Sequence, residues 1–292
     1  MDQDTAATET FETHRPLLAA MAYQLLGSTA EAEDVVQETW LRWDRADREE
    51  IANPKAWLVR VATRLALDRL RTAKIRREQY VGPWLPEPLL TSPDVAEDVE
   101  RAESVSMAML VVLETLSPLE RAVFVLREAF GFSHGEVAEA LGRSEQAVRQ
   151  LAHRAREHVQ ARRPRFRLDR GVRQQVTERF LAAALGGDLD DLLRVLAPDV
   201  TLWADGGGRA DAPRRPIHGA DKVARFLAAV AGSAGEVDVD LLDVNGGPAA
   251  VVIAAGSPAG VVVVDTDAAG DSVQTIYLVM NPEKTTRFSR AG

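Results

Sequence analysis

The amino-acid sequence predicts two all-α helical domains, the second a helix-turn-helix, followed by an α+β domain with a curved antiparallel sheet. Three observations support this fold class. Apolar residues recur at helical spacing over most of residues 11–163, a proline-rich stretch interrupts that pattern once, and runs of β-branched residues gather in residues 237–280. We place the domains at residues 11–77, 107–163 and 166–292, with a linker at residues 78–106.

The first domain contains three expected helices. Apolar residues from Phe11 to Leu26 recur at helical spacing. Thr29 can cap a second helix that continues to residue 46, and acidic residues in its first turn suit the helix dipole. Pro54 suits the first turn of a third, long helix that continues to residue 77.

Helical periodicity is lost in the linker. The segment GPWLPEP, residues 82–88, has three prolines, which favour extended backbone. Such a linker presents two apolar side chains, Trp84 and Leu85, that look exposed from the sequence.

Residues 117–163 predict a helix-turn-helix. Ser133 can cap a short helix, Gly142 lies at the turn, and Ser144 can cap the helix that follows. Opposite an apolar face, this last helix has a face of basic and amide side chains: Gln146, Arg149, Gln150, His153, Arg154 and Arg156. A recognition helix places its first side chains on base edges and later basic ones on phosphates, so this face predicts contact with DNA.

The pattern changes after Phe166. An amphipathic helix, a Gly-Gly break and a short helix lead into a strand that ends near Asp205. After a helix near residues 219–231, four runs of β-branched residues are separated by Gly, Pro, Asn and Asp. Helices followed by a run of strands predict an α+β unit.

Composition restricts the function classes. The chain has 292 residues, a formal charge of −9 and no cysteine, which excludes disulfides, a thiolate nucleophile and a cysteine metal site. Its first ten residues are too polar for a secretory signal, and its most apolar stretch, residues 249–264, is too short to span a bilayer. We therefore expect a cytoplasmic protein with no cofactor, no metal and no membrane partner.

The positive charge of this acidic chain is concentrated in two segments. Lys55 to Glu78 has eight Lys or Arg against two acids, and Ser144 to Arg165 has six Arg against two Glu. The stretch from Glu87 to Glu128 between them is acidic. Two basic helical segments joined by an acidic connector predict two contacts with one polyanion.

The helix EAEDVVQETWLRW, followed by NPKAWLVRVATRLALDRLRTAK, resembles region 2 of the extracytoplasmic-function sigma factors, and the helix-turn-helix resembles their region 4. This resemblance implies that region 2 binds core RNA polymerase and opens the downstream promoter element, while region 4 reads the upstream element. By the same likeness, the surface that binds the clamp helices of the polymerase contains Asp34, Gln37, Glu38 and Leu41. A solvated helix face is the alternative interpretation of its acidic residues.

The third helix supplies the candidates for the downstream element: Trp57, Arg60, Arg64, Arg69 and Arg71. Arginines there attract phosphates and can favour separated strands. Asp68 and Arg71 match the family's Asp-x-x-Arg, for which an intradomain salt bridge is the alternative. Arg64 stands where the family commonly has Asn, so the family's rule for reading an unstacked base does not carry over.

The upstream element is assigned to the recognition face. Arg149 and Gln150 are the first base-reading candidates, with Gln146 next, because Arg suits guanine and Gln suits adenine. Arg154 and Arg156 are expected to anchor phosphates, and His153 suits either role. A merely surface-charged helix is the alternative.

The C-terminal third resembles the SnoaL-like cone-shaped α+β fold, some members of which are polyketide cyclases or isomerases while others only bind. Its acid/base candidates are Asp205, Asp211 and His218, beside Trp203, and loop aspartates that cap turns are the alternative. A small ligand in a C-terminal pocket is left open. The run DGGG lacks the Gly-Lys-Ser/Thr ending of a phosphate loop.

One subgroup of these sigma factors fuses a SnoaL-like extension to region 4 and has three short motifs: WLPEP, DGGG and an NPDKL-like segment. This chain matches them with Trp84, Leu85, Pro86, Glu87 and Pro88, with Asp205, Gly206, Gly207 and Gly208, and with Asn281, Pro282, Glu283 and Lys284. It departs from the third motif at Thr285, which replaces an apolar residue, and at Glu283, which replaces Asp. The likeness implies regulation in cis, with the linker docked on the DGGG loop. A linker that packs on its own neighbours is the alternative.

The sequence thus predicts a transcription initiation factor with no enzymatic activity of its own. Two alternatives stay open. One is a plain helix-turn-helix regulator that binds DNA without polymerase, and the other is a SnoaL-type enzyme with a helical targeting module.

Overall fold

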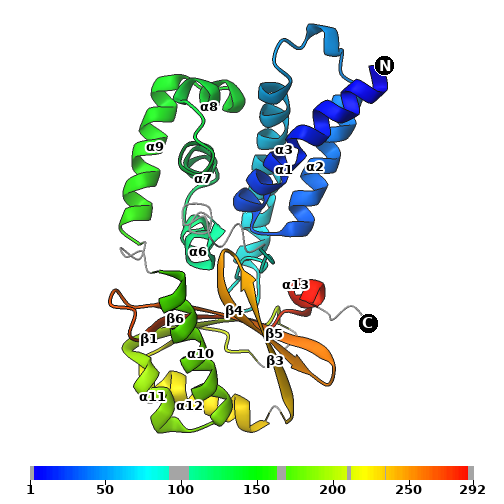
Figure 1. The fold of residues 1–292 in the computed structure, drawn as a ribbon. Coiled ribbons are helices and arrows are strands. Elements are labelled where there is room, and N and C mark those ends of the chain that lie inside the picture. Colours follow the sequence, from blue (N-terminus) through cyan, green and yellow to red (C-terminus); the bar gives the residue numbers. More distant parts are fainter. Residues whose placement is uncertain (1–2, 92–104, 163–168, 209–211, 234, 289–292) are drawn as a thin grey trace. The chain divides into compact units, whose positions relative to one another are not determined.

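The structure is a computed structural model that describes residues 3–91, 105–162, 169–208, 212–233 and 235–288 (Figure 1). The chain divides into two compact units, and each unit combines two stretches of sequence. The first unit contains residues 1–78 and 112–162, and the second contains residues 79–111 and 163–292. The described part of the linker therefore belongs to the same unit as the C-terminal domain.

The first unit begins with the helices α1 (Gln3–Leu26), α2 (Thr29–Asp44) and α3 (Pro54–Glu78), with the 3-10 turn η1 (Arg48–Glu50) before α3. Each of the three long helices packs on the other two around a core that includes Leu18, Met21 and Leu58. The prediction that Thr29 caps α2 is wrong by one residue. Ser28 has extended backbone and its hydroxyl accepts from the Glu31 amide at 3.4 Å, whereas Thr29 is already helical.

The helix-turn-helix follows within the same unit. Its helices are α7 (Pro118–Phe124), the π-helical turn η2 (Val125–Ala129), α8 (His134–Leu141) and α9 (Glu145–Gln160). Ser133 caps α8 in a capping box, Gly142 ends α8 in the left-handed region at φ 63°, and Ser144 caps α9, which confirms the predicted caps and turn. Val148, Ala152, Ala155 and Val159 are the buried side of α9.

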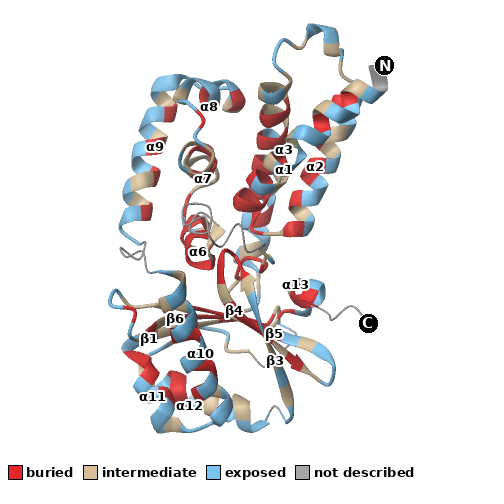
Figure 2. Cartoon of the chain, viewed as in Figure 1, coloured by how far each residue is buried: buried red, intermediate tan, exposed pale blue. Residues whose placement is uncertain are grey.

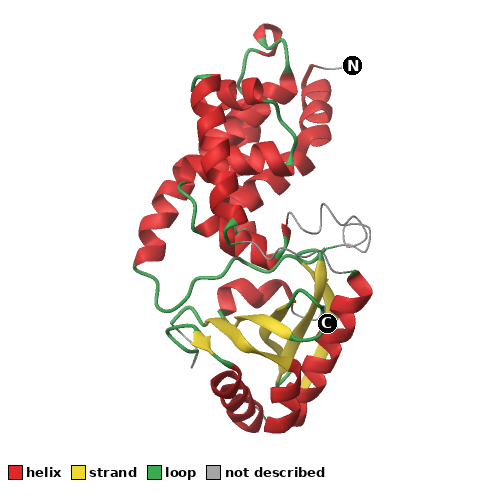
Figure 3. Ribbon diagram, turned by 90° about the vertical axis from the view of Figure 1, so that its left-hand side faces the viewer, coloured by secondary structure: helices red, strands yellow, loops and turns green. Residues whose placement is uncertain are grey.

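The second unit is an α+β domain, as Figure 3 shows. Its longer helices are α6 (Met107–Glu114), α10 (Arg170–Gly186), α11 (Leu189–Val195) and α12 (Ala220–Ser233), and its last turns are α13 (Pro282–Thr285) and η3 (Thr286–Phe288). Residues 112–114, the end of α6, belong to the first unit. The strands are β1 (Leu196–Asp205), β2 (Ile217–His218), β3 (Val237–Val244), β4 (Gly247–Ala254), β5 (Ser257–Thr266) and β6 (Val273–Val279). They form one sheet in the order β2-β1-β6-β5-β4-β3.

The α+β class is confirmed, but the sheet is mixed, whereas we had expected an antiparallel sheet. β1 and β6 pair in parallel, with Leu202 opposite Ile276 and Asp205 opposite Val279. The other paired strands are antiparallel. Adjacent parallel strands have their carboxyl ends at the same end of the sheet. The residues that follow β1 and those that follow β6 are therefore close together.

Successive strand residues point to opposite sides of the sheet, so both faces have side chains to bury. Both faces are covered by other elements of the unit, and buried residues recur along the strands (Figure 2). One face packs on α10, α11 and α12 around Phe180 and Leu192. The other face packs on the linker residue Leu85 and on Met107 and Ala108 of α6. The linker is thus part of the core of this domain.

Within the described ranges, none of the helices combines the length and the apolar character that crossing a bilayer requires. The same ranges contain no group of three or more Asp, Glu or His side chains arranged to hold a metal ion.

Candidate functional site

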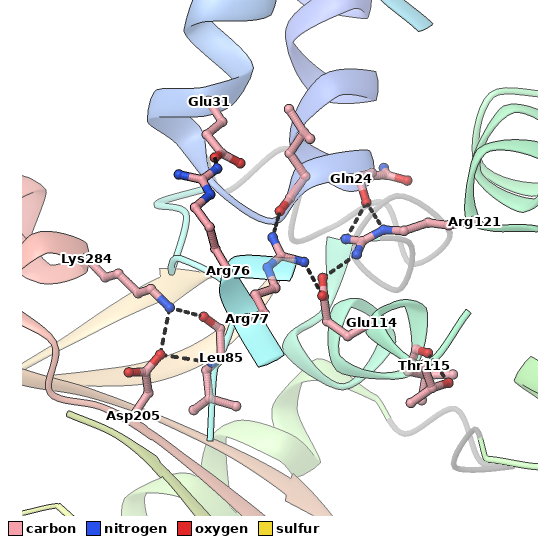
Figure 4. Close-up of polar contacts among 12 residues, drawn as sticks. Gln24, Glu31, Arg76, Arg77, Leu85, Glu114, Thr115, Arg121, Asp205 and Lys284 are labelled. Carbon is pink, nitrogen blue, oxygen red and sulfur yellow. Dashed lines mark hydrogen bonds and ion pairs between the residues drawn. The ribbon is translucent and has the colours of Figure 1, made fainter. Parts of the chain in front are cut away.

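Three segments that are distant in sequence meet around the carboxylate of Asp205, at the end of β1 (Figure 4). This carboxylate is fully buried and accepts four hydrogen bonds. Oδ1 accepts from the Tyr80 hydroxyl at 2.5 Å and from the Gly207 amide at 3.1 Å. Oδ2 accepts from the Leu85 amide at 2.9 Å and from Lys284 Nζ at 2.6 Å. The linker, the DGGG loop and α13 therefore share one anion.

Lys284 supplies the charge that balances Asp205. Its ammonium also donates to the Leu85 carbonyl and lies 4.2 Å from the centroid of the Trp84 ring, in cation–π geometry. The Lys284 side chain is only 11% exposed. Buried charges need such pairing, so the docked linker and the ion pair stabilise each other.

Tyr80 is a residue that the sequence analysis missed. Its hydroxyl donates to Asp205 and accepts from Asn281 Nδ2 at 2.8 Å. Burial, followed by the hydrogen bond to Asp205, raises the pKa of Tyr80, so the phenol stays protonated and keeps donating. The signal available in the sequence was its place four residues before Trp84.

The glycines of the DGGG loop are required by its geometry. Gly207 and Gly208 have φ of 62° and 73°, in the left-handed region that side chains rarely adopt. A Cβ on Gly207 would lie 2.7 Å from Asn281 Cγ, and one on Gly208 would lie 3.1 Å from Val81 Cβ. These close approaches let the loop contact both the linker and the residue that begins α13.

The β3–β4 hairpin is a second anchor for the linker, also missed from the sequence. Its turn residue Asn245 is buried and has φ of 53°. Asn245 Oδ1 accepts from the Leu89 amide at 3.1 Å, its own amide donates to the Leu89 carbonyl at 2.8 Å, and Nδ2 donates to the Val105 carbonyl at 2.9 Å. Leu90 forms a β-bridge with Val244 beside it. Both described ends of the linker are therefore fastened to one turn.

The remaining motif residues lie around these anchors. Leu85, expected to look exposed, is fully buried, as are Pro86, Glu87 and Pro88, while Trp84 is half-buried. Glu87 faces Arg287 at 3.7 Å, Gly206 is buried, and Pro282 and Glu283 form the exposed first turn of α13, which Asn281 caps. Thr285, which departs from the motif, is buried, and its hydroxyl donates to the Asn281 carbonyl at 3.4 Å.

Two of the three acid/base candidates, Asp205 and His218, lie in the described part of the chain, and they have different surroundings. Asp205 is surrounded by the four donors described above, and Trp203 packs on the linker side of the core. His218 is exposed on β2, with Nδ1 3.1 Å from Thr201 Oγ1. Asp211 lies outside the described residues. Asp205 and His218 thus have separate partners.

In the first unit, the candidates for polymerase contact share one face of α2. Asp34, Gln37 and Leu41 are exposed and Glu38 is half-buried. Asp34 pairs with Arg69 of α3 at 2.8 Å, and Glu38 pairs with Arg42 at 3.0 Å. The face is therefore accessible, with two of its carboxylates in exposed ion pairs.

Two candidates for the downstream element contact α8. Arg64 Nε donates to the Ala140 carbonyl at 3.2 Å, and Arg60 Nη1 lies 3.7 Å from Glu139 Oε1. The helix-turn-helix thus occupies part of the α3 surface that was assigned to DNA.

The other three downstream candidates have partners within the first three helices. The Trp57 ring lies 5.5 Å from that of Trp43. Arg69 pairs with Asp34, and Arg71 pairs with Asp68 at 2.9 Å, which is the intradomain salt bridge left open as an alternative.

A buried ion cluster joins the two parts of this unit (Figure 4). Glu114 pairs with both Arg77 of α3 and Arg121 of α7. Arg121 is 1% exposed and also donates twice to the Gln24 carbonyl, at 3.1 and 2.9 Å. Burial lowers the pKa of Arg77, while Glu114 opposes that shift. The packed arrangement of this unit therefore depends on a shared carboxylate.

The recognition face of α9 is accessible. Gln146, Arg149, Gln150, His153 and Arg154 are exposed and Arg156 is half-buried. Ser144 caps the amino end of α9, where its hydroxyl accepts from the Ala147 amide at 3.2 Å, and the first polar side chains of the helix are exposed. This geometry suits insertion of α9 into a major groove.

Comparison with known proteins relates each part of the chain to a family. The family model described as Sigma-70 region 2 matches residues 10–75, Sigma-70 region 4 matches residues 106–159, and the SnoaL-like domain matches residues 177–279. The chain is 47% identical to the ECF RNA polymerase sigma factor SigJ of Mycobacterium tuberculosis over 74% of this chain and 70% of that protein. It is 36% identical to the probable ECF RNA polymerase sigma factor SigI of the same species over 76% of each chain. The crystal structure of M. tuberculosis SigJ superposes with a TM-score of 0.75 and 38% identity, over 95% of this chain and 97% of that chain.

Proposed function

This chain belongs to the extracytoplasmic-function (ECF) RNA polymerase sigma factors, and we propose that its SnoaL-like domain regulates promoter-specific initiation in cis through the docked linker. As a sigma factor it binds core RNA polymerase and directs transcription initiation at promoter DNA. The observation that supports regulation in cis is the linker held in the core of the C-terminal domain around Asp205.

We assign roles within the first unit from the side chains that each helix exposes. The α2 face with Asp34, Gln37, Glu38 and Leu41 would bind the polymerase, because it is exposed and lies opposite the side of α2 that packs in the core. On α9, Arg149 and Gln150 would read bases, while Arg154 and Arg156 would hold phosphates.

Region 2 and α8 share two arginines. Arg60 and Arg64 bond to α8 in this structure, so a strand of the downstream element would compete with α8 for them and would gain both fully when α8 leaves α3. These two polar contacts are weak by themselves. However, α8 also packs on α3, and the buried Glu114 cluster joins α3 to α7, so separating the two regions breaks a packed interface. Binding to core polymerase would supply that free energy by separating the two regions.

The C-terminal domain acts by holding the linker. Lys284, Asp205 and Asn245 together hold residues 80–91, the first described part of the linker between region 2 and region 4, and a fixed linker limits the positions that the two regions can take. Release of the linker would lengthen the free connection between them. A buried, fully satisfied polar cluster suits such a two-state element because it is either complete or broken.

We propose no catalytic role for this domain. A general acid or base needs access to a substrate, and Asp205 is buried under four protein donors. Alanine at His218 is therefore expected to leave transcription unchanged.

Run-off transcription with core RNA polymerase tests the proposal. The full chain is compared with a chain that ends at Pro164 and with the Asp205→Asn variant, which removes the shared anion. Both variants should change the amount of transcript while leaving the start site and promoter choice the same. The matched control is Asp221→Asn, which removes an exposed carboxylate paired with Arg225 on α12. Equal transcript from all four proteins would contradict regulation in cis.

A further inference from the structure

All four basic candidates of the recognition face are paired with glutamates of the same helix-turn-helix. Two of the pairs lie within α9. Arg149 pairs with Glu145, and His153 Nδ1 lies 3.2 Å from Glu157 Oε2.

The other two pairs join α9 to α7 and η2, which precede α8. Arg154 Nε lies 3.7 Å from Glu120 Oε1 of α7, and Arg156 Nε lies 3.0 Å from Glu128 Oε1 of η2. The second of these pairs is the shorter and the better aligned, and it is also a hydrogen bond.

The formal charges of Arg and Glu cancel over residues 117–160 of the helix-turn-helix, and Arg162 and Arg163 follow at its end. Residues 117–160 contain six Arg, no Lys, six Glu and no Asp. Sequence-independent affinity for duplex DNA comes almost entirely from cations that neutralise phosphates. The basic side chains of the recognition face, which are already paired with glutamates, therefore contribute less to that affinity.

The placement of Glu128 depends on local backbone geometry. It lies in the π-helical turn η2, where the wider turn shifts the side chains that follow relative to those of α7. Such turns are rare and concentrate at functional sites. Here the π-helical turn comes directly before α8. It places Glu128 against Arg156, which lies 28 positions later in the chain.

We propose that Glu128 is a positioning residue for Arg156 and lowers the sequence-independent affinity of the helix-turn-helix for duplex DNA. The proposal rests on the assignment of Arg156 as a phosphate anchor under the proposed function. In the free protein Glu128 holds the Arg156 guanidinium, and binding a phosphate requires exchange of that partner. The protein then depends on tethering to the polymerase, and on base contacts, to occupy DNA.

The test is the salt dependence of duplex binding by the full chain, with Glu128→Gln as the main variant. Fluorescence anisotropy with a labelled duplex that lacks promoter elements, measured from low salt upward, gives the affinity and its slope against salt. Glu128→Gln should bind roughly two- to fivefold more tightly, which is the range that one exposed ion pair covers. The slope of log affinity against log salt should steepen by up to about 0.9, the value for one further neutralised phosphate.

Two controls separate positioning from a general effect of charge. Glu178→Gln makes the same change in net charge at an exposed glutamate of α10 that accepts from Gln174, and it should match the wild type. In an Arg156→Gln background, Glu128→Gln should no longer change affinity or slope. An effect that persists in that background would overturn the proposal.

An unchanged slope and affinity for Glu128→Gln would also overturn it. Run-off transcription with core polymerase on the same preparations keeps this failure distinct from failure of the proposed function. Transcription with an unchanged slope removes only the role of Glu128, whereas absence of core-dependent transcript from the wild type removes the proposed function itself.

Discussion

The linker should be released by a substitution that replaces a single heavy atom of Asp205, one carboxylate oxygen by an amide nitrogen. In Asp205→Asn, the amide oxygen can keep two of the four hydrogen bonds, for example those from Tyr80 and Gly207. The amide nitrogen then faces the Leu85 amide and the Lys284 ammonium, which are both donors. Neither finds an acceptor in the new side chain.

The magnitude follows from burial. Asp205 is 0% exposed and Lys284 is 11% exposed in its side chain, so the ammonium loses its counter-charge in a place that water reaches poorly and keeps the Leu85 carbonyl and the Trp84 ring. Removing one partner of a buried ion pair costs about 3–5 kcal/mol. Since 1.4 kcal/mol is a factor of ten, the equilibrium for linker release should shift by about a hundredfold to several thousandfold.

Hydrogen exchange at the Leu85 amide measures this shift directly, because that amide donates to the substituted group. Its protection should fall by the same factor in Asp205→Asn, while amides of β5, in the centre of the sheet, keep theirs. Asp221→Asn, which breaks an exposed pair, should change neither. Protection of Leu85 within tenfold of the wild type would refute the reasoning that the ion pair holds the linker.

Three further predictions concern other parts of the chain. Glu114→Gln should lower the free energy of unfolding of the first unit by about 3–5 kcal/mol in urea denaturation, because Arg121 is left buried without a carboxylate, and a loss below about 1 kcal/mol would contradict this. Asn245→Gly keeps the left-handed turn but removes the side-chain acceptor, so the Leu89 amide should lose protection corresponding to about 1–3 kcal/mol in hydrogen exchange, and unchanged protection would show that the backbone bond alone suffices. Burial raises the pKa of Asp265 from 3.8 to about 6, so the folded state keeps this proton while the unfolded state has lost it. The stability of the second unit should therefore fall as pH rises from 3.8 to about 6, and Asp265→Asn should remove that fall; parallel pH profiles of the two proteins would contradict the assignment.

Local elements of this protein were predictable because their signals act over a few residues. Ser133, Gly142 and Ser144 each act on the backbone within four residues of themselves, and the helix-turn-helix forms where they indicate. The one misplaced cap, Thr29 for Ser28, shows the limit of such signals. Two neighbouring hydroxyl residues suit the same role, and packing of Thr29 against the core decides between them.

The candidate sites were predictable to different degrees. The basic face of α9 follows from helical spacing alone, since one apolar side determines the opposite side. The short motifs of the linker and the loops were recognisable, whereas Tyr80 and Asn245 were not. Tyr80 and Asp205 are 125 positions apart, and no spacing within either segment indicates that a phenol and a carboxylate will meet.

By itself, the sequence determined the order of the domains, the caps and turn of the helix-turn-helix, and the basic and amide side chains of the exposed α9 face, because these depend on local backbone preferences and on periodicity. Only the tertiary structure decided that β1 and β6 run in parallel, so that Asp205 at the end of one and Lys284 beyond the other reach the same edge. Only the tertiary structure decided, too, that Leu85 is core rather than surface and that α8 contacts Arg60 and Arg64. The physical reason is that these contacts join segments far apart in sequence. Their stability depends on which apolar side chains are buried and on which buried charges find a partner, and local sequence preferences specify neither.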